Sequence, residues 1–308
     1  MSDSVDALRK PVPFEWPTLA LIGLCYVAWA LLTLHASTLG GWLAVPLMGI
    51  VLAFHSSLQH EVLHGHPFSD QRLSDALVFP ALGLFVPYER FRDTHLAHHR
   101  DEILTDPYDD PESNYLDPAV WARLPGWRRA LLRANNTLAG RMALGPAIGL
   151  ATFWAGDLRA IRVGDPAVRR AYALHVAGLV PVVAWLAMLG TMPVWQYLLA
   201  AYLGLSLLKI RTFLEHRAHE KAAGRSVVIE DRGPLALLFL NNNFHAVHHA
   251  SPRVAWYRLP ALYRARREEV LRRNRGYRYA SYREVFASHF LRAKDPVPHP
   301  LRQGPGEG

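Results

Sequence analysis

Cysteine is almost absent from this chain, with Cys25 as the single thiol among 308 residues. One thiol cannot form a disulfide within the chain, and it cannot supply the thiolate sets that hold structural zinc or iron–sulfur clusters. The first ten residues, MSDSVDALRK, also lack the basic start and cleavage site of a secretory signal, so no such signal is expected. Any metal chemistry in this protein therefore has to use other side chains.

Lysine and arginine are absent from two long stretches, residues 11–71 and 171–208. Each stretch has room for two helical crossings of a membrane, which need about 20 residues each. Turn signals interrupt the stretches near their middles, at Ser37–Gly41 and Gly190–Pro193. Such long paired stretches disfavour the buried core helices of a soluble protein. The prediction is an all-α integral membrane protein with four transmembrane helices in two hairpins, at Thr18–His35, Trp42–Leu58, Tyr172–Leu189 and Val194–Phe213.

The 34 basic residues lie before the first hairpin, between the hairpins, at the end of the fourth span or after it. Basic loops stay on the cytoplasmic side, so both termini and the central loop are expected there. Residues 59–171 and 214–308 would then form a helical cytoplasmic cap that carries the functional site, within one membrane domain over residues 1–308.

The net charge of +8 is consistent with a basic cap beside anionic lipid headgroups. No module that reads nucleic-acid grooves is visible, so we expect no nucleic-acid partner. Thirty arginines against four lysines are typical of a GC-rich bacterial genome, which favours a multi-pass protein of a bacterial inner membrane.

Histidines are the most informative residues, and the first cluster lies in QHEVLHGHP, Gln59–Pro67. His60, Glu61 and His64 form an H-E-x-x-H pattern, which on a helix is typical of zinc proteases with the glutamate as base. His66 follows His64 by two residues and would face away from it on a helix. It is not expected to bind a metal.

Two further clusters repeat an H-x-x-H-H spacing: His95, His98 and His99, then His245, His248 and His249. On a helix these positions share a face, so each cluster can aim three imidazoles at one point. Eight imidazoles exceed the four ligands of one zinc ion and suit two metal ions. All-nitrogen sites fit iron, copper or zinc, and of these iron or copper would carry out oxygen chemistry.

With these clusters the chain resembles the membrane fatty acid desaturases, four-span di-iron enzymes with three histidine boxes. The resemblance rests on HEVLH followed by Gly65, on HLAHH and on HAVHH, with TDPYDDPE and SPRVAWYRLP after the second and third boxes. It covers roughly Trp42–Pro260. It implies two iron ions, dioxygen as co-substrate, a membrane-lipid acyl chain as substrate, and an external ferredoxin- or cytochrome-type electron donor.

The resemblance also implies a further histidine ligand on the cytoplasmic extension of the fourth span, and His216 matches its position best. His219, one turn later, is expected to support a ligand or to lie at the surface. Some family members carry an asparagine one turn before this histidine, as a water-mediated iron contact. Thr212 stands there instead, which leaves that contact in question. The implied ligand set is His60, His64, His95, His98, His99, His216, His245, His248 and His249.

Metal-bound imidazoles usually donate their second N–H to an acceptor side chain or a carbonyl group. Five residues lie near the boxes in sequence and are candidates for this support: Glu61, Asp93, Asp106, Glu215 and Asn242. Each carboxylate is equally compatible with a turn or a helix surface, and Asn242 with a helix cap.

The histidine motifs are compatible with several functions. Acyl desaturation fits the resemblance, with acyl-lipid and acyl-thioester substrates both compatible. A di-iron lipid or alkane hydroxylase or a carotenoid oxygenase would share the same site, since the outcome depends on how the substrate is placed. An intramembrane zinc protease would use His60, Glu61 and His64 alone, and would leave six clustered histidines unexplained.

Overall fold

The structure, a computed structural model, describes residues 8, 12, 14–100 and 102–302. Apart from Leu8, the N-terminal segment discussed above lies outside the described residues. Among the described residues the chain divides into two compact units, which we call the membrane unit (residues 12–92 and 146–208) and the histidine unit (Leu8 with residues 93–145 and 209–302). One domain over the whole chain stays a prediction.

The described residues are mostly helical. The membrane unit contains α2 (Trp16–Leu34), α3 (Ala36–Leu39), α4 (Gly41–Leu63), α5 (Gln71–Leu77) and α10 (Pro166–Met188). Three helices contain a boundary between the units: α6 (Tyr88–His98), α9 (Leu138–Arg162) and α11 (Val194–Thr212). The histidine unit contains α7 (Pro118–Arg123), α8 (Gly126–Asn135), η1 (Ala222–Gly224), β1 (Val228–Ile229), α12 (Pro234–Leu238), α13 (His245–Ala250), α14 (Leu259–Arg273), β2 (Arg278–Tyr279) and α15 (Tyr282–His289).

Each of the four predicted spans is a helix. Within the described residues, α2, α4 and α10 are long and apolar enough to cross a membrane. α11 is not among these candidates, and it carries Lys209 and Arg211 in its last turn. The protein is thus a mostly helical membrane protein. The fourth crossing, the cytoplasmic cap and the side on which each terminus lies stay predictions.

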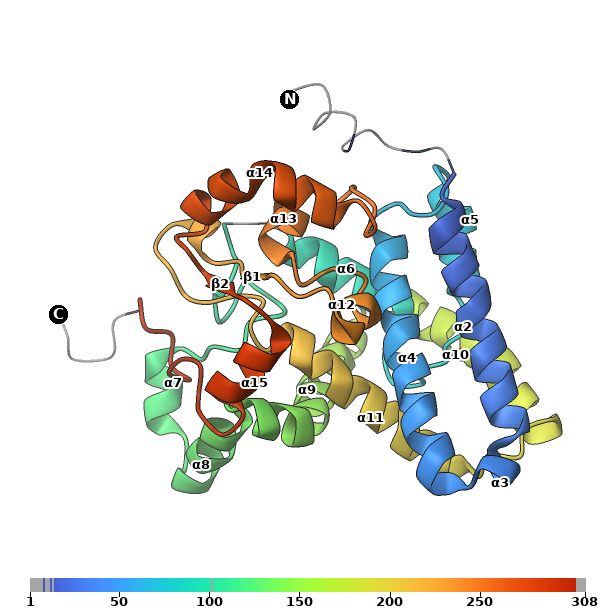
Figure 1. The fold of residues 1–308 in the computed structure, drawn as a ribbon. Coiled ribbons are helices and arrows are strands. Elements are labelled where there is room, and N and C mark those ends of the chain that lie inside the picture. Colours follow the sequence, from blue (N-terminus) through green and yellow to red (C-terminus); the bar gives the residue numbers. More distant parts are fainter. Residues whose placement is uncertain (1–7, 9–11, 13, 101, 303–308) are drawn as a thin grey trace. The chain divides into compact units, whose positions relative to one another are not determined.

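In the membrane unit, α2 and α4 run side by side and are joined through α3 (Figure 1). The Trp29 indole donates a 2.8 Å hydrogen bond to the Tyr197 hydroxyl, which donates in turn to the carbonyl oxygen of Leu82. Gly49 of α4 and Gly204 of α11 allow their backbones to approach closely, because a Cβ on Gly204 would lie 3.1 Å from the Gly49 carbonyl oxygen. Small residues serve this purpose at helix contacts in membranes.

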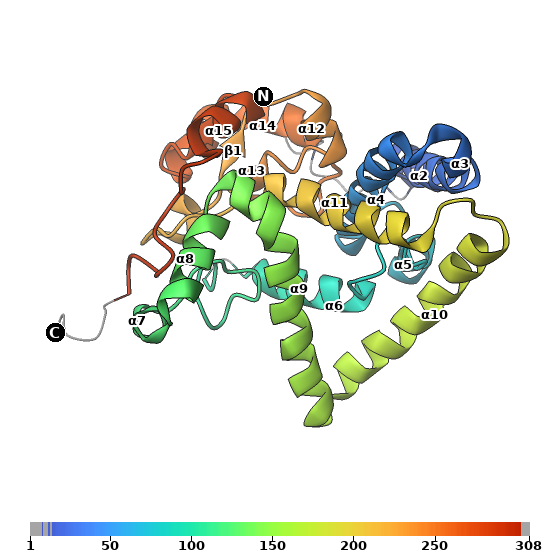
Figure 2. The same ribbon diagram turned by 90° about the horizontal axis from the view of Figure 1, so that it is seen from below.

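A sharp turn joins α9 to α10 (Figure 2). Gly164 adopts a φ of +94°, a backbone conformation that residues other than glycine disfavour. Asp165 then caps α10 by accepting hydrogen bonds from the backbone N–H groups of Ala167 and Val168.

The histidine unit is organised around α13, which carries the third histidine box. β1 pairs with β2 in parallel, and the Ile229 N–H of β1 donates to the carbonyl oxygen of Asn243, just before α13. Val247 of α13 packs with Leu259 and Leu262 of α14 in a buried apolar cluster. These contacts fix the box between a strand pair and a helix.

Candidate metal centre

Two asparagine side chains hold the segment that leads into the third box. The amide group of Asn241 donates to the carbonyl oxygen of Trp256, and that of Asn243 donates to the carbonyl oxygens of Ile229 and Asp231. Asn241 also adopts a φ of +56°, a conformation that asparagine tolerates better than most residues. The chain therefore enters α13 in a defined direction.

Four histidines of the histidine unit form one cluster, in which each offers a ring nitrogen and these nitrogens lie within 4.8 Å of one another: His98, His216, His245 and His249. The Nε2 atom of His216 lies 2.9 Å from that of His98 and 3.0 Å from that of His245. This four-histidine cluster joins residues from α6, from the segment after α11 and from α13.

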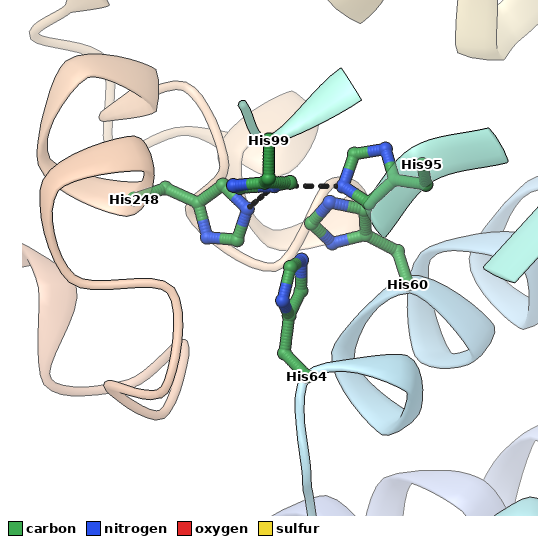
Figure 3. Close-up of side chains that lie close together, drawn as sticks. All are labelled: His60, His64, His95, His99 and His248. Atoms are coloured by element: carbon green, nitrogen blue, oxygen red, sulfur yellow. Dashed lines mark hydrogen bonds between the residues drawn. The ribbon is translucent and has the colours of Figure 1, made fainter. Parts of the chain in front are cut away.

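Three other histidines of this unit form a second cluster, His95, His99 and His248, whose ring nitrogens also lie within 4.8 Å of one another. The Nε2 atom of His99 lies 3.0 Å from that of His95 and 3.1 Å from that of His248, as the dashed lines in Figure 3 show. The rings of His99 and His249 stack with centroids 4.2 Å apart, so the three-histidine and four-histidine clusters are adjacent.

The structure differs from the expectation that each box aims three rings at one point. His95 and His99 of the second box enter one cluster and His98 enters the other. The third box divides in the same way, with His245 and His249 together and His248 apart. In both boxes the rings at positions i and i+4 belong to one cluster, and the ring at position i+3 belongs to the other cluster.

Two rings of the second box donate hydrogen bonds to carboxylates from Nδ1, which we call the outer nitrogen of each ring. The Nδ1–H of His98 donates to Asp110 at 2.8 Å, and the Nδ1–H of His95 donates to Glu112 at 2.9 Å. Because Nδ1 carries the hydrogen of the neutral ring, the Nε2 atom of each ring faces its cluster and becomes a ligand atom once it has lost any proton. The chain around Asp110 is itself fixed, since this carboxylate accepts from the backbone N–H groups of Thr105 and Glu112.

The outer nitrogens of two further rings also meet polar side chains. The Nδ1–H of His245 donates to the Asn242 amide oxygen at 3.1 Å, while the Asn242 amide group donates to Glu215 at 3.2 Å. His216 Nδ1 lies 3.2 Å from the Ser226 hydroxyl oxygen. The structure thus places Asn242 and Glu215, both expected near the site, beside the third box.

Within the two histidine clusters, positive charge lies on His98 of the second box. Burial lowers the pKa of His98, but the carboxylates of Glu112 and Asp110 outweigh this effect and raise the pKa to about 9. Burial raises the pKa of Glu112, yet the charges of His98 and His95 outweigh it and hold that pKa below its usual range. Burial lowers the pKa values of His216 and His245 well below normal. Without an ion, His98 is therefore protonated and these two rings are neutral at pH 7.

The first box lies in the membrane unit. His60 is in the last turn of α4 and His64 follows as its C-cap, with their ring centroids 5.0 Å apart (Figure 3). Both rings are buried. Glu61 lies near the next histidine instead, with its carboxylate 3.7 Å from His66 Nε2. His66 Nδ1 donates to Glu15 at 2.9 Å.

Four further candidates were expected near the ligands: Asp93, Asp106, Thr212 and His219. Asp106 accepts hydrogen bonds from the backbone N–H groups of Tyr108 and Asp109 and pairs with Arg302. His219 accepts from the Lys221 N–H in a turn. Asp93 is an exposed residue of α6, and Thr212 is the last residue of α11.

Sequence reasoning missed Asp110, Glu112 and Ser226. TDPYDDPE follows the second box, but four carboxylates within seven residues give no signal that selects Asp110 and Glu112 over Asp106. Ser226 lies ten residues after His216 in an unremarkable polar segment, and no spacing rule points to it.

The histidines present fit transition-metal ions. Two nitrogens that bind one ion at about 2.1 Å and at right angles to each other lie about 3 Å apart, and the Nε2 pairs of both clusters lie 2.9–3.1 Å apart. Imidazole donors suit iron, zinc or copper, and the outer hydrogen bonds match those of metal-bound histidines.

Comparison with known proteins agrees with this chemistry. Residues 36–281, which contain all nine histidines, match the family model described as fatty acid desaturase. The chain is also 24% identical to the beta-carotene ketolase of Paracoccus sp. (strain N81106 / MBIC 01143) over 230 residues, which cover 71% of this chain and 74% of that protein. The chain belongs to the fatty acid desaturase family, a family of membrane di-iron oxidoreductases.

Proposed function

We propose that this protein is a dioxygen-dependent fatty acid desaturase that introduces a carbon–carbon double bond into a lipid acyl chain at a di-iron centre. The observation that carries the proposal is the pair of adjacent histidine clusters, in which Nε2 atoms converge while outer nitrogens are held by acceptors. Membership of the desaturase family supports the choice of reaction.

Nine histidines are proposed to hold two iron ions. Seven come from the two clusters of the histidine unit. His60 and His64 complete the set, because the family match includes the first box and the two residues lie in the last turn and at the C-cap of α4. Bound iron would supply dioxygen activation, which no side chain in this protein can perform.

The residues around the histidines favour metal binding by these rings. Asp110 and Glu112 keep the hydrogen of each ring on Nδ1, so each Nε2 is available as a ligand. His95, His98, His245 and His248 are buried, which keeps bulk water away from their nitrogens. Exclusion of water matters in this chemistry because it protects reactive oxidants from side reactions.

The reaction needs partners that the chain does not contain. Removal of two hydrogens from an acyl chain consumes one dioxygen, two further electrons and two protons, and yields two waters. The electrons are proposed to come from an external ferredoxin- or cytochrome-type donor, and the acyl chain from a membrane lipid or thioester.

Oxygenation of a carotenoid is a second candidate, favoured by the similarity to a beta-carotene ketolase. The same histidines would serve, and the product would gain oxygen: one oxygen atom for each hydroxyl group, or one oxygen atom with the loss of two hydrogens for each keto group. Hydroxylation of a lipid or an alkane is a further outcome, and mass spectrometry of the products distinguishes it from desaturation.

The test is expression with a ferredoxin and its reductase in two bacterial hosts, one of them producing beta-carotene, followed by mass spectrometry of lipids and pigments. Desaturation predicts an acyl product two hydrogens lighter, absent with His98→Ala. Oxygen gained on the acyl chain or the carotenoid would replace the desaturase proposal with the matching oxygenase. One zinc and no iron in the purified protein would contradict the di-iron centre itself.

A further inference from the structure

Positive charge in the histidine unit is concentrated in one segment. Residues 253–278 contain nine arginines and two glutamates. Seven of the arginines are exposed: Arg253, Arg264, Arg267, Arg272, Arg273, Arg275 and Arg278. We call this surface, formed by α14 and the turns on either side of it, the arginine face.

A cavity of about 70 Å³ connects the arginine face with the four-histidine cluster. His249 forms part of its lining, and this residue is half-buried whereas His98 and His245 of the same cluster are buried. α14 contributes Arg266 and Arg273 to the lining. The cavity thus brings a metal-ligand candidate and the basic surface into one concave site.

The arginine face lacks the apolar side chains that a helix uses to enter a lipid surface. Residues 253–278 are all described, and none of their large hydrophobic side chains is exposed. By contrast, α8 combines arginines with Trp127, which is 63% exposed, and Leu131, which is 36% exposed. A basic helix with exposed tryptophan and leucine is typical of a membrane interface, whereas a purely charged face favours an acidic protein surface.

We propose that the arginine face binds an acidic one-electron carrier protein, which docks over the cavity beside His249. The proposal rests on the proposed function, because that reaction requires two electrons from outside the chain, which the two proposed iron ions would accept one at a time. Each carrier would give up one electron and leave oxidised, so two successive dockings would supply one turnover. Opposite charges accelerate such encounters and make them sensitive to salt.

The experiment measures the binding of an oxidised, acidic [2Fe–2S] ferredoxin to the purified full-length protein in nanodiscs of neutral lipid. Arg272→Glu with Arg273→Glu reverses two charges on the arginine face. Arg128→Glu with Arg129→Glu makes the same change on α8 and serves as the matched control. We expect the first pair to raise the Kd about tenfold or more at low salt, and the control pair to leave it within about twofold.

Iron content and melting temperature are compared first, so that an unfolded variant is recognised. A single Arg264→Gln variant, expected to raise the Kd about threefold, replaces the arginine-face pair if that pair does not fold. Equal Kd values for both pairs and wild type, a larger loss with the α8 pair, or no ferredoxin binding by wild type would overturn the docking proposal.

Turnover with a chemical reductant separates this inference from the proposed function. The arginine-face pair should retain wild-type product formation when dithionite replaces ferredoxin. If wild type binds ferredoxin through the arginine face but forms no lipid or carotenoid product, the docking stands and the proposed reaction fails.

Discussion

At the scale of single residues, Asp110 and Glu112 determine which nitrogen of His98 and His95 faces the clusters. The spacing of the histidines identified the rings as ligand candidates, because i, i+3 and i+4 positions lie on one side of a helix. The acceptors come from a loop more than ten residues away from the rings they hold. A sequence with many acidic residues in that loop does not specify which of them turns inward.

We expect Asp110→Asn and Glu112→Gln to weaken metal binding about 10–100-fold each, because loss of such outer hydrogen bonds has that typical effect. The measurement is titration of the metal-free protein with Co²⁺, followed by its visible spectrum. Asp109→Asn is the control, since this neighbouring carboxylate is exposed. Wild-type affinity in the Asp110 variant would show that the carboxylate does not support a ligand.

Metal binding should also strengthen as pH rises from about 7 to about 9. The pKa of His98 is raised to about 9 in the metal-free protein, so its proton must leave before Nε2 of this ring can act as a ligand. Each pH unit below this pKa therefore costs about a factor of ten in affinity, and the dependence disappears above it. The pKa values of His216 and His245 are lowered, so these rings add no dependence in this window.

The pH dependence is measured by Co²⁺ titrations in a pH series, with proton release recorded in weakly buffered solution. Glu112→Gln should move the window to lower pH, because Glu112 contributes to the raised pKa of His98. Affinity that is constant across the window would contradict a protonated His98.

At the scale of elements, the charge-free stretches located α2, α4, α10 and α11, but not α9, which is 25 residues long and contains Arg141. The second box was expected on one helix, yet α6 ends at His98, one residue before His99. The whole third box lies on α13. Neighbouring rings on a helix differ by about 100° per residue, so the division of each box between two clusters depends on what packs against the helix.

Gly178 of α10 makes a contact that no other residue permits without movement. The Ala81 N–H donates to the Gly178 carbonyl oxygen, and a Cβ on Gly178 would lie 2.6 Å from the carbonyl oxygen of Phe79. We expect Gly178→Ala to destabilise the protein by about 1–3 kcal/mol through overpacking. In α9, a Cβ on Gly156 would have no neighbour within 4 Å, so Gly156→Ala should be neutral or slightly stabilising.

The two glycine variants are compared by thermal unfolding in detergent. A lower melting temperature for Gly178→Ala and an unchanged or higher one for Gly156→Ala is expected. Equal melting temperatures would show that α10 moves away from the Phe79 segment at little cost.

At the scale of the whole molecule, the number of membrane crossings can be tested with the single native cysteine removed by Cys25→Ala. Thr191 and Arg275 are exposed, and each can be replaced by cysteine for labelling with a membrane-impermeant reagent. If α11 crosses the membrane, Thr191→Cys and Arg275→Cys should be labelled from opposite sides. Labelling from the same side would leave α2, α4 and α10 as the crossings and would reject the four-span prediction.

The sequence by itself identified the histidines that cluster and located α2, α4, α10 and α11, because imidazole spacing and missing charge are local properties. It singled out His95, His98 and His99 without any contact information. The tertiary structure decided which rings share a cluster and which acceptors hold them. His98 joins His216, 118 residues later in the chain, and Asp110 fixes its tautomer. Such pairings depend on how distant segments pack, and no periodicity within one segment encodes them.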